Sequence, residues 1–475
     1  MADRPVSWTW DVRDSAALAG VTVLAGILRF WHLAYPPRIV FDEVYYAHDA
    51  CVFVKPASIC GGGPAYSEEH PLLAKWLIAA GIKMFGFTPF GWRVVPATFG
   101  TIAVALTFLL AWRLLGSTVA ALLASGAFAI DGLAFVQSRV AMLDVFVATF
   151  SLATILCVVM DRDRDRRAEE RLRDRPWLLA AGVMGGAAIA SKWSGIPFLA
   201  MAVVLVLFWD RRQPRADRGV LRADLAPVLV FLVAVPLAVY VLSFAGRLDG
   251  SVLAVPWDRH SWAWAFVRRQ AHILGFHADL RGPYPYESPA WSWPLLKRPV
   301  VFAFQETSGT FREILALGNP VVWWAGSLAV VVCAVRWVRD LPSHRAAGGS
   351  QRPEGVVLAG VAAGYLWWLP ATSTRTFSFL FYFLPAVPFV CIALARVAQL
   401  TWGRVSGRAA TGAVAVAAVV SFAFFLPILS YRPLDGDAWA SRLWFRSCEP
   451  VPLQGDPPHP QSHVVTGPPT GWCWV

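Results

Sequence analysis

Long apolar runs recur along the whole chain, and they restrict the possible fold more than any other feature of the sequence. A helix that crosses a bilayer needs about 20 predominantly apolar residues, and in lipid its backbone polar groups must be satisfied within the protein. Only 15% of the 475 residues are charged, and these cluster between the apolar runs. The sequence therefore predicts an all-α, multi-pass membrane protein. We expect eleven spans, at residues 16–34, 94–112, 117–134, 140–160, 177–191, 195–209, 225–246, 319–335, 355–370, 377–395 and 409–430.

The basic residues predict how the chain is oriented. Three short connecting segments, 162–175, 211–222 and 336–352, are rich in Arg, and such segments usually face the cytoplasm. The N-terminus is then cytoplasmic, the first run is a retained anchor, and the protein belongs in the cell membrane. The surplus of basic residues, a net charge of +11, is a topology signal and a contact for membrane lipids, so we expect no nucleic-acid partner.

The same orientation places three segments outside the cell. They are the first outer segment (37–93), the central outer segment (247–318) and the tail (431–475). Residues 1–430 then form one membrane-embedded domain, followed by an extracytoplasmic tail.

Four cysteines lie in these outer segments. Cys51 and Cys60 share the first, Cys448 and Cys473 share the tail, and the cytoplasmic connectors contain none. Because disulfides persist in oxidising compartments, this distribution predicts one local bridge within each segment. Four free thiols are the alternative.

Two adjacent carboxylates, Asp42 and Glu43, follow the end of the first apolar run and are flanked by Phe41 and Val44. Carboxylates that are close together and poorly solvated tend to have a raised pKa in at least one of the two. A raised pKa suits a general base. The alternative is an acidic pair that is simply solvated at a helix end.

Further along the first outer segment, residues 72–85 are apolar but too short to span a membrane comfortably. We expect a helix that lies in the membrane interface. Lys75 and Arg93 would then present cations at the depth of lipid phosphates. The alternative reading, lysines that only anchor the helix, is favoured for Lys83.

Several motifs resemble the protein O-mannosyltransferase family. The opening stretch, Arg29–Ala50, contains Phe-Asp-Glu, and Glu69–Gly81 contains a His-Pro-x-Leu-x-Lys pattern. The resemblance covers essentially the whole chain, and its last elements are similar to the actinobacterial branch. Two features depart from the family pattern: Leu72 replaces a proline, and the central segment is too short for the soluble domain of eukaryotic members. The later motifs are SRVAMLDVF (138–146), SKWSG (191–195), YPYESPAWSWPLLKRPV (284–300), GNPVVWW (318–324), TRTFSFLFYFLPAVPF (374–389) and PPTGWCWV (468–475).

The resemblance implies a membrane-embedded glycosyltransferase fold of the GT-C type. It also implies transfer of mannose, with inversion, from polyprenyl-phosphate-mannose to Ser or Thr hydroxyls of proteins being secreted. Asp42 is expected to be the general base and Glu43 its partner in placing donor or acceptor, although the sequence leaves open which of the two is the base. The residues expected near the donor phosphate or mannose are His70, Lys75, Arg93, Lys192 and Arg375.

One carboxylate, Asp144, falls inside a predicted span. A charge at the bilayer centre costs about 2.5–3.5 kcal/mol on insertion scales, so we expect a structural pair with Arg139 or a contact with substrate. Glu69 is a further residue expected at the site, because it precedes His70 in the motif.

The sequence predicts no metal site and no other cofactor, because it has no His/Cys cluster with ligand spacing, although an acidic pair leaves a divalent cation possible. Two rival functions stay open. One is a related lipid-linked transferase with another sugar or a lipid acceptor. The other is a secondary transporter, against which the clustering of candidate groups at the outer boundary argues.

Overall fold

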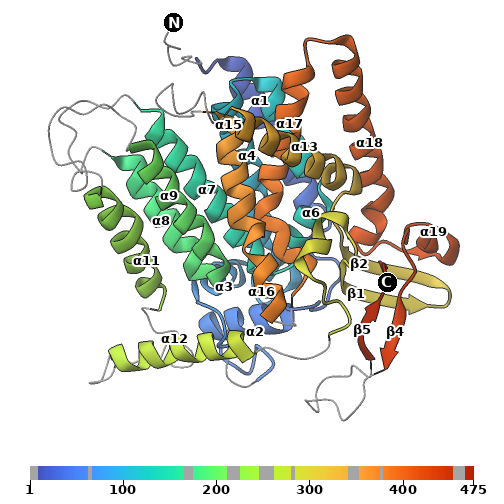
Figure 1. Ribbon diagram of the computed structural model, residues 1–475. Helices are drawn as coiled ribbons and strands as arrows, with labels where there is room; N and C mark the ends of the chain where they lie inside the picture. The colour runs from blue at the N-terminus through green and yellow to red at the C-terminus, as the bar shows by residue number, and fades with distance from the viewer. Residues whose placement is uncertain are drawn as a thin grey trace, which may run out of the picture.

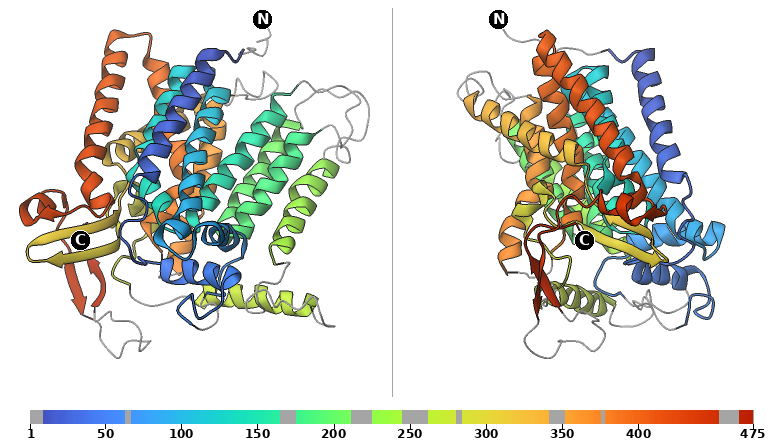
Figure 2. Two further views of the ribbon diagram at one scale, coloured as in Figure 1. Left: turned by 180° about the vertical axis from the view of Figure 1, so that it is seen from behind. Right: turned by 90° about the vertical axis from the view of Figure 1, so that its right-hand side faces the viewer.

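The computed structural model describes residues 9–62, 67–164, 175–210, 225–244, 262–279, 284–340, 352–374, 378–452 and 466–474. Long helices stand side by side, while short helices and strands gather at one end of the bundle (Figures 1 and 2). The described parts of all three predicted outer segments lie at this end, which we call the outer end. Helix α1 (Val12–Phe30) begins at the opposite end.

Within the described residues, seven helical segments are long and apolar enough to cross a membrane. Each of the eleven predicted runs overlaps a helix, but α1 does not reach this standard, and α8 and α9 are short, so the count of eleven spans stays a prediction. The seven are α4 (Pro89–Leu115), α7 (Asp144–Arg162), η3 (Val228–Ala234) with α11 (Val235–Ser243), α13 (Pro320–Arg339), α15 (Pro353–Val361) with η5 (Ala362–Leu366) and α16 (Trp368–Thr374), η6 (Leu380–Ala386) with α17 (Val387–Thr401), and α18 (Val405–Leu429).

The predicted run 117–134 is broken in the structure. Helices α5 (Thr118–Ala129) and α6 (Gly132–Arg139) meet at 59°. Asp131 causes the break, because its carboxylate caps α6 through the Ala134 N–H (2.9 Å) and also accepts from the Asn319 N–H (2.9 Å) and the Trp323 indole (2.7 Å). The N-cap residue of a helix has non-helical φ and ψ angles, so the helical path from α5 into α6 is interrupted at Asp131.

Small residues bring the helices close together. In α8 (Pro176–Ser191), a Cβ at Gly182 would lie 1.9 Å from the Phe231 carbonyl oxygen of the neighbouring span. This close approach is the packing that small residues permit in membrane bundles. After α8 the chain passes through η2 (Trp193–Gly195) into α9 (Ile196–Asp210).

Two helices of the first outer segment pack against each other beneath the bundle. They are α2 (Glu43–Val54) and α3 (Leu73–Phe85), and α3 coincides with the interfacial helix expected over 72–85. A disulfide joins Cys51 in α2 to Cys60, with the two Cα atoms 5.7 Å apart. The central outer segment contributes α12 (Trp262–Asp279), which runs across the outer end, and η4 (Ala290–Leu295).

Two small sheets at the outer end were not predicted. Strands β1 (Val300–Thr307) and β2 (Thr310–Ala316) form a hairpin, to which β3 (Leu434–Asp435) adds. The turn, Ser308-Gly309, has positive φ at both residues, as tight hairpins require. The tail adds α19 (Gly436–Ala440) and a second sheet of β4 (Glu449–Pro452) and β5 (Thr466–Thr470).

The tail is fastened to the central outer segment. A disulfide joins Cys448 to Cys473, and the Cys473 N–H donates to the Lys297 carbonyl at 3.2 Å. The buried Trp474 indole donates to the Leu296 carbonyl at 2.7 Å. The end of the chain is therefore part of the packed outer end.

Candidate active site

The backbone just before α2 is held in an unusual conformation. Phe41 has a φ of 47°, a region that non-glycine residues seldom adopt. Its ring stacks on Phe302 of β1 (centroids 4.2 Å apart) and meets Phe381 of η6 edge-on. A backbone conformation of this kind is strained, and it persists where the surrounding packing holds it in place. The packing of Phe41 thereby fixes the direction in which the side chain of the next residue, Asp42, leaves the backbone.

The two adjacent carboxylates have different surroundings. Glu43 is fully buried, and its two oxygens form a bidentate pair with Arg93, at 2.7 Å to Nε and 2.9 Å to Nη2. The backbone N–H groups of Val40 and Ala141 also donate to Glu43. Asp42, by contrast, is only partly buried. Four donors therefore seal Glu43, whereas Asp42 is the more accessible of the two carboxylates.

Arg93 holds the chain between α1 and α2 in place, and we call this set of contacts the latch. Besides Glu43, its guanidinium donates to the carbonyls of Leu33, Pro36 and Arg38. Only 1% of Arg93 is exposed. The donors of Arg93 serve a buried carboxylate and three carbonyls, and its expected contact with the donor phosphate stays a prediction.

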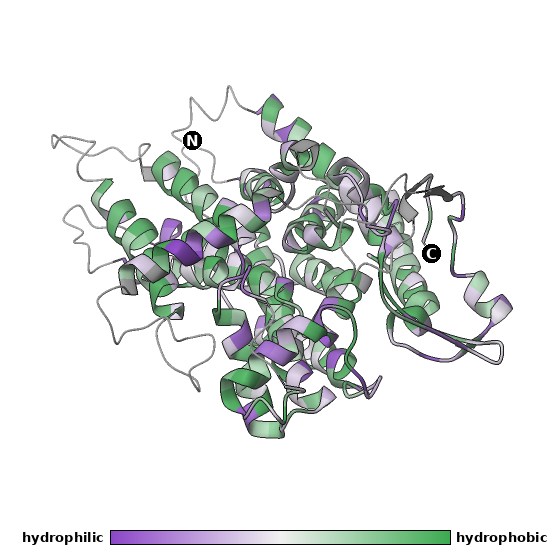
Figure 3. Cartoon of the chain, turned by 90° about the horizontal axis from the view of Figure 1, so that it is seen from below, coloured by the Kyte–Doolittle hydropathy of each residue, from purple (hydrophilic) through white to green (hydrophobic). Residues whose placement is uncertain are grey.

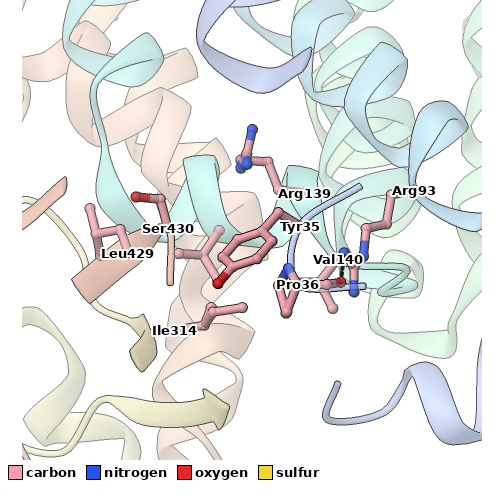
Figure 4. A pocket seen from close by; sticks show the side chains of 9 residues that line it. Tyr35, Pro36, Arg93, Arg139, Val140, Ile314, Leu429 and Ser430 are labelled. Carbon is pink, nitrogen blue, oxygen red and sulfur yellow. Dashed lines mark hydrogen bonds between the residues drawn. The ribbon is translucent and has the colours of Figure 1, made fainter. Parts of the chain in front are cut away.

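A small pocket borders this latch (Figure 4). Asp42, Asp144 and Lys192 are absent from its lining, and for this reason we do not place the site there. The lining residues are Tyr35, Pro36, Arg93, Val136, Arg139, Val140, Ile314, Leu429 and Ser430.

A lysine and the intramembrane carboxylate form a second ion pair. The Lys192 ammonium, in the turn after α8, lies 3.0 Å from each Asp144 oxygen at the start of α7. It also lies 4.6 Å from the centroid of the Tyr382 ring. An ammonium has three N–H donors, and Asp144 takes two of them. The third is available to another acceptor.

The expected pair between Asp144 and Arg139 is wrong. Arg139 instead donates to carbonyls at the end of α1, at 2.8 Å to Arg29 and 2.6 Å to Trp31. The physical reason is that α6 ends at Arg139 and α7 begins at Asp144, so the two side chains do not share a helix face. Arg139 thus satisfies the free carbonyls of a helix terminus.

The charges of Lys192 and Asp144 act on Asp42. Burial raises the pKa of Asp42 to about 7, Lys192 lowers it, and Asp144 raises it. Asp42 is thus electrostatically coupled to an ion pair whose two members come from distant parts of the sequence. A carboxyl group with a pKa near 7 is matched to general-base work at neutral pH.

The charge of Asp42 acts on three tyrosines. Asp42 raises the pKa of Tyr45, Tyr46 and Tyr284, in each case after the larger effect of burial. Tyr382 stands over Lys192, as described above. Tyr284 and Tyr382 belong to the motifs at 284–300 and 374–389, so their membership of these motifs was the only signal in the sequence.

Lys75 lies in a different environment from the one expected. Its ammonium, which is fully buried, pairs with Asp49 of α2 at 2.8 Å and donates to the Ser67 carbonyl. This pair ties α3 to α2. In the described structure Lys75 therefore serves a buried carboxylate and a carbonyl, and its expected contact with the donor phosphate stays a prediction.

The remaining residues that the sequence predicts for the site lie at the edge of the cluster formed by Asp42, Lys192 and Asp144. The His70 ring is 5.9 Å from that of Tyr46 and 5.2 Å from that of His277 in α12. The charge of Glu69 acts on Tyr45 and Tyr46, and its carbonyl contacts the His277 ring nitrogen at 3.1 Å. Arg375 lies outside the described residues.

Among the residues that the structure describes, no three His, Cys, Asp or Glu side chains lie close enough together to hold a metal ion.

Comparisons with known proteins agree with this architecture. The family described as dolichyl-phosphate-mannose-protein mannosyltransferase matches residues 87–247, and the C-terminal four-helix membrane region of protein O-mannosyltransferases matches 263–448. A Mycolicibacterium smegmatis protein named polyprenol-phosphate-mannose–protein mannosyltransferase is 30% identical over 94% of this chain and 93% of its own length.

Solved structures share the fold. The S. cerevisiae protein O-mannosyltransferase Pmt1-Pmt2 complex bound to the sugar donor has a TM-score of 0.73 at 16% identity, over 91% of this chain and 92% of the other. ArnT from Cupriavidus metallidurans in the apo state has a TM-score of 0.54 at 16% identity, over 87% and 76% of the two chains. The chain therefore belongs to the protein mannosyltransferase family and is a multi-pass membrane protein with the GT-C type of glycosyltransferase fold.

Proposed function

We propose that this protein transfers mannose from polyprenyl-phosphate-mannose to Ser or Thr hydroxyls of proteins, at the extracytoplasmic face of the cell membrane. The observation that carries the proposal is the cluster of Asp42, Lys192 and Asp144 at the outer end of the bundle. The family and the name of the M. smegmatis relative support the choice of donor and acceptor. The N-terminus is then cytoplasmic, and the tail is extracytoplasmic.

In the proposed reaction, Asp42 accepts the proton of the acceptor hydroxyl as its oxygen attacks the anomeric carbon of mannose. A new C–O bond forms to the Ser or Thr oxygen while the bond from the anomeric carbon to the phosphate oxygen breaks. The electron pair leaves with the polyprenyl phosphate. A single displacement of this kind inverts the anomeric centre and needs one base, by analogy with inverting glycosidases.

Lys192 is proposed to hold the departing phosphate. Its third N–H donor is free of Asp144, and its charge already acts on Asp42, so both ends of the displacement lie near it. Asp144 is proposed to orient the ammonium rather than to react. His70, Glu69 and the tyrosines around Asp42 are proposed to line the substrates, and Arg375 stays a candidate for the phosphate.

We expect Lys192→Gln to raise the KM for the lipid-linked donor by about 10–100-fold, which corresponds to losing one hydrogen bond between charged partners. The KM for a Ser/Thr peptide should change little. Initial rates at varied donor and peptide concentrations measure both values. Lys192→Arg is the matched variant, because it keeps the positive charge and should recover part of the donor affinity. An unchanged donor KM in Lys192→Gln would remove Lys192 from the phosphate site.

The pH profile should reflect Asp42. Its carboxyl must be deprotonated to act as a base, and its pKa is raised to about 7. We therefore expect kcat/KM to rise about tenfold per pH unit below pH 7 and to level off above it. Two other outer carboxyls, Glu287 and Glu313, also have a pKa raised to about 7 by burial. The variants Glu287→Gln and Glu313→Gln should keep the same profile; a profile that flattens in either of them would reassign the titrating group.

The function itself is tested with purified protein in lipid nanodiscs. Polyprenyl-phosphate-mannose with a radiolabelled sugar and a Ser/Thr-containing peptide are supplied, and mannosyl-peptide is identified by mass spectrometry. A donor with another sugar, or a lipid acceptor without peptide, tests the related transferases. Sealed proteoliposomes that take up the sugar without transferring it would instead indicate a transporter.

A further inference from the structure

Helix α12 has three distinct faces along its length. Residues at helical spacing on one face, among them Phe266, Gln270, Ile273 and His277, pack against the protein. The remaining surface of the helix is exposed, and it divides into an apolar stripe and a mainly basic one. The apolar stripe consists of Trp264, Val267, Ala271, Leu274 and Ala278, and the basic stripe consists of Arg268, His272 and, at its largely covered edge, Arg269, with Phe276 as its apolar member.

The apolar stripe is unusually open for large side chains outside the spans. Trp264 is 61% exposed, Val267 52% and Leu274 60%. A helix whose exposed surface faced only water would be polar on all of that surface. An exposed apolar stripe beside a cationic one is typical of helices that lie in the plane of a membrane interface, and Trp prefers this depth.

The contacts of α12 show which way each stripe faces. The last span before α12 touches the side of the helix that adjoins the apolar stripe, because Gln270 accepts from the Tyr240 hydroxyl and Phe266 packs on Phe244. On the other side, Arg269 of the basic stripe pairs with Glu68 of the first outer segment. The apolar stripe therefore lies on the side of α12 nearer the spans, and the basic stripe lies on the side away from them. Figure 3 views this end of the molecule directly.

The apolar stripe also continues a lipid-facing surface. The span that contains α11 exposes Leu237 (58%) and Leu242 (64%), and its end lies directly above α12 (Figure 1). Exposed apolar side chains on a spanning helix are the ones that lipid covers. The exposed surface of that span therefore passes into the apolar stripe of α12 at the outer end.

From these observations we infer that α12 lies in the outer-leaflet interface, with Trp264, Val267 and Leu274 inserted among the lipids. The occupant of this stripe is the lipid bilayer itself. The packed face of α12, which carries Gln270 and His277, contacts residues next to two parts of the candidate site. The Trp193 indole donates to the Tyr240 hydroxyl (2.9 Å), which donates to Gln270 (2.5 Å), and His277 contacts the Glu69 carbonyl.

In this arrangement the membrane helps to fix the depth at which the candidate site lies. Trp193 directly follows Lys192, and Glu69 directly precedes His70. A helix seated at a fixed depth in the interface would hold both turns at the depth where a lipid-borne phosphate lies. This second part of the inference rests on the proposed function, whereas the seating of α12 in the membrane does not.

The seating is tested with the full-length protein in nanodiscs. A bimane fluorophore is attached at Val267→Cys or, as the matched control on the basic stripe, at His272→Cys. The unmutated protein, whose cysteines Cys157, Cys333 and Cys391 are buried, serves as the labelling blank. The Val267 label should be quenched by lipids brominated near the headgroup and protected from aqueous iodide, and the His272 label should behave in the opposite way.

Iodide quenching of the Val267 label without quenching by brominated lipid would overturn the inference. Protection from both quenchers, with energy transfer between differently labelled copies, would also overturn it, because another protein copy would then cover the stripe. The link to the site is tested with Val267→Asp/Leu274→Asp against His272→Asp. We expect at least a tenfold rise in donor KM in nanodiscs for the double variant only. An unchanged donor KM would contradict the link and leave the quenching result intact.

Discussion

Asp42→Asn should lower kcat for mannosyl transfer by about 10²–10⁴-fold, the range that a positioned general base contributes. The amide has nearly the same shape as the carboxylate but cannot accept the acceptor's proton at neutral pH. Donor KM should change little, because in the proposed mechanism Lys192, not Asp42, holds the phosphate. Single-turnover transfer from bound donor to peptide measures the step directly.

The control for this variant is Glu306→Gln. Glu306 is an exposed carboxylate of β1 at the same end of the molecule, and its substitution should leave kcat unchanged. The Asp42→Asn protein should still elute as a folded monodisperse species and bind donor. Full-rate transfer by this variant would refute the assignment of the base and, with it, the proposed mechanism.

Breaking the Glu43–Arg93 pair should destabilise the protein rather than alter its chemistry. Glu43→Gln leaves the Arg93 charge buried without its carboxylate, and removing one partner of a buried pair costs about 3–5 kcal/mol. We expect a matching decrease in the free energy of unfolding, measured by denaturant titration in detergent micelles. The effect is large because both side chains are almost entirely sealed, at 0% and 1% exposure.

A double variant separates this charge effect from the loss of shape. Glu43→Gln/Arg93→Met removes both charges and should recover part of the lost stability, although the carbonyls of Leu33, Pro36 and Arg38 lose their donor. The surface pair of Asp340 with Arg352 supplies the comparison, since Asp340 is 31% exposed and Arg352 43%. Asp340→Asn should cost less than about 1 kcal/mol. Equal costs at the two sites would contradict the latch role.

The membrane character of the chain could be predicted from local sequence. Each predicted apolar run overlaps a helix, because twenty apolar residues in lipid have little alternative to a helix. The pairing of Cys51 with Cys60 and of Cys448 with Cys473 in the structure follows the predicted segments. The hairpin of β1 and β2 was not predicted, because strands of eight and seven residues leave a weaker periodic signal than a spanning helix.

The assignment of individual ionic residues required the tertiary structure. Asp42 and Glu43 are neighbours in sequence with the same charge, yet one faces the candidate site and the other is sealed against Arg93. The partners decide this outcome, and they come from α4 and the α6–α7 junction, about 50 and 100 residues further on. For the same reason the sequence could not show that Lys75 pairs with Asp49, Arg93 with Glu43 and Lys192 with Asp144.

The sequence by itself therefore determined that this is a multi-pass membrane protein, which family it resembles, and which short motifs carry its chemistry. Hydrophobic length and motif identity are local properties, so one segment suffices to read them. Only the tertiary structure decided which of the two carboxylates is sealed by partners, which cations are already paired, and which face of α12 packs against the protein. Those properties depend on burial and on charges brought close by distant segments, and no local pattern encodes them.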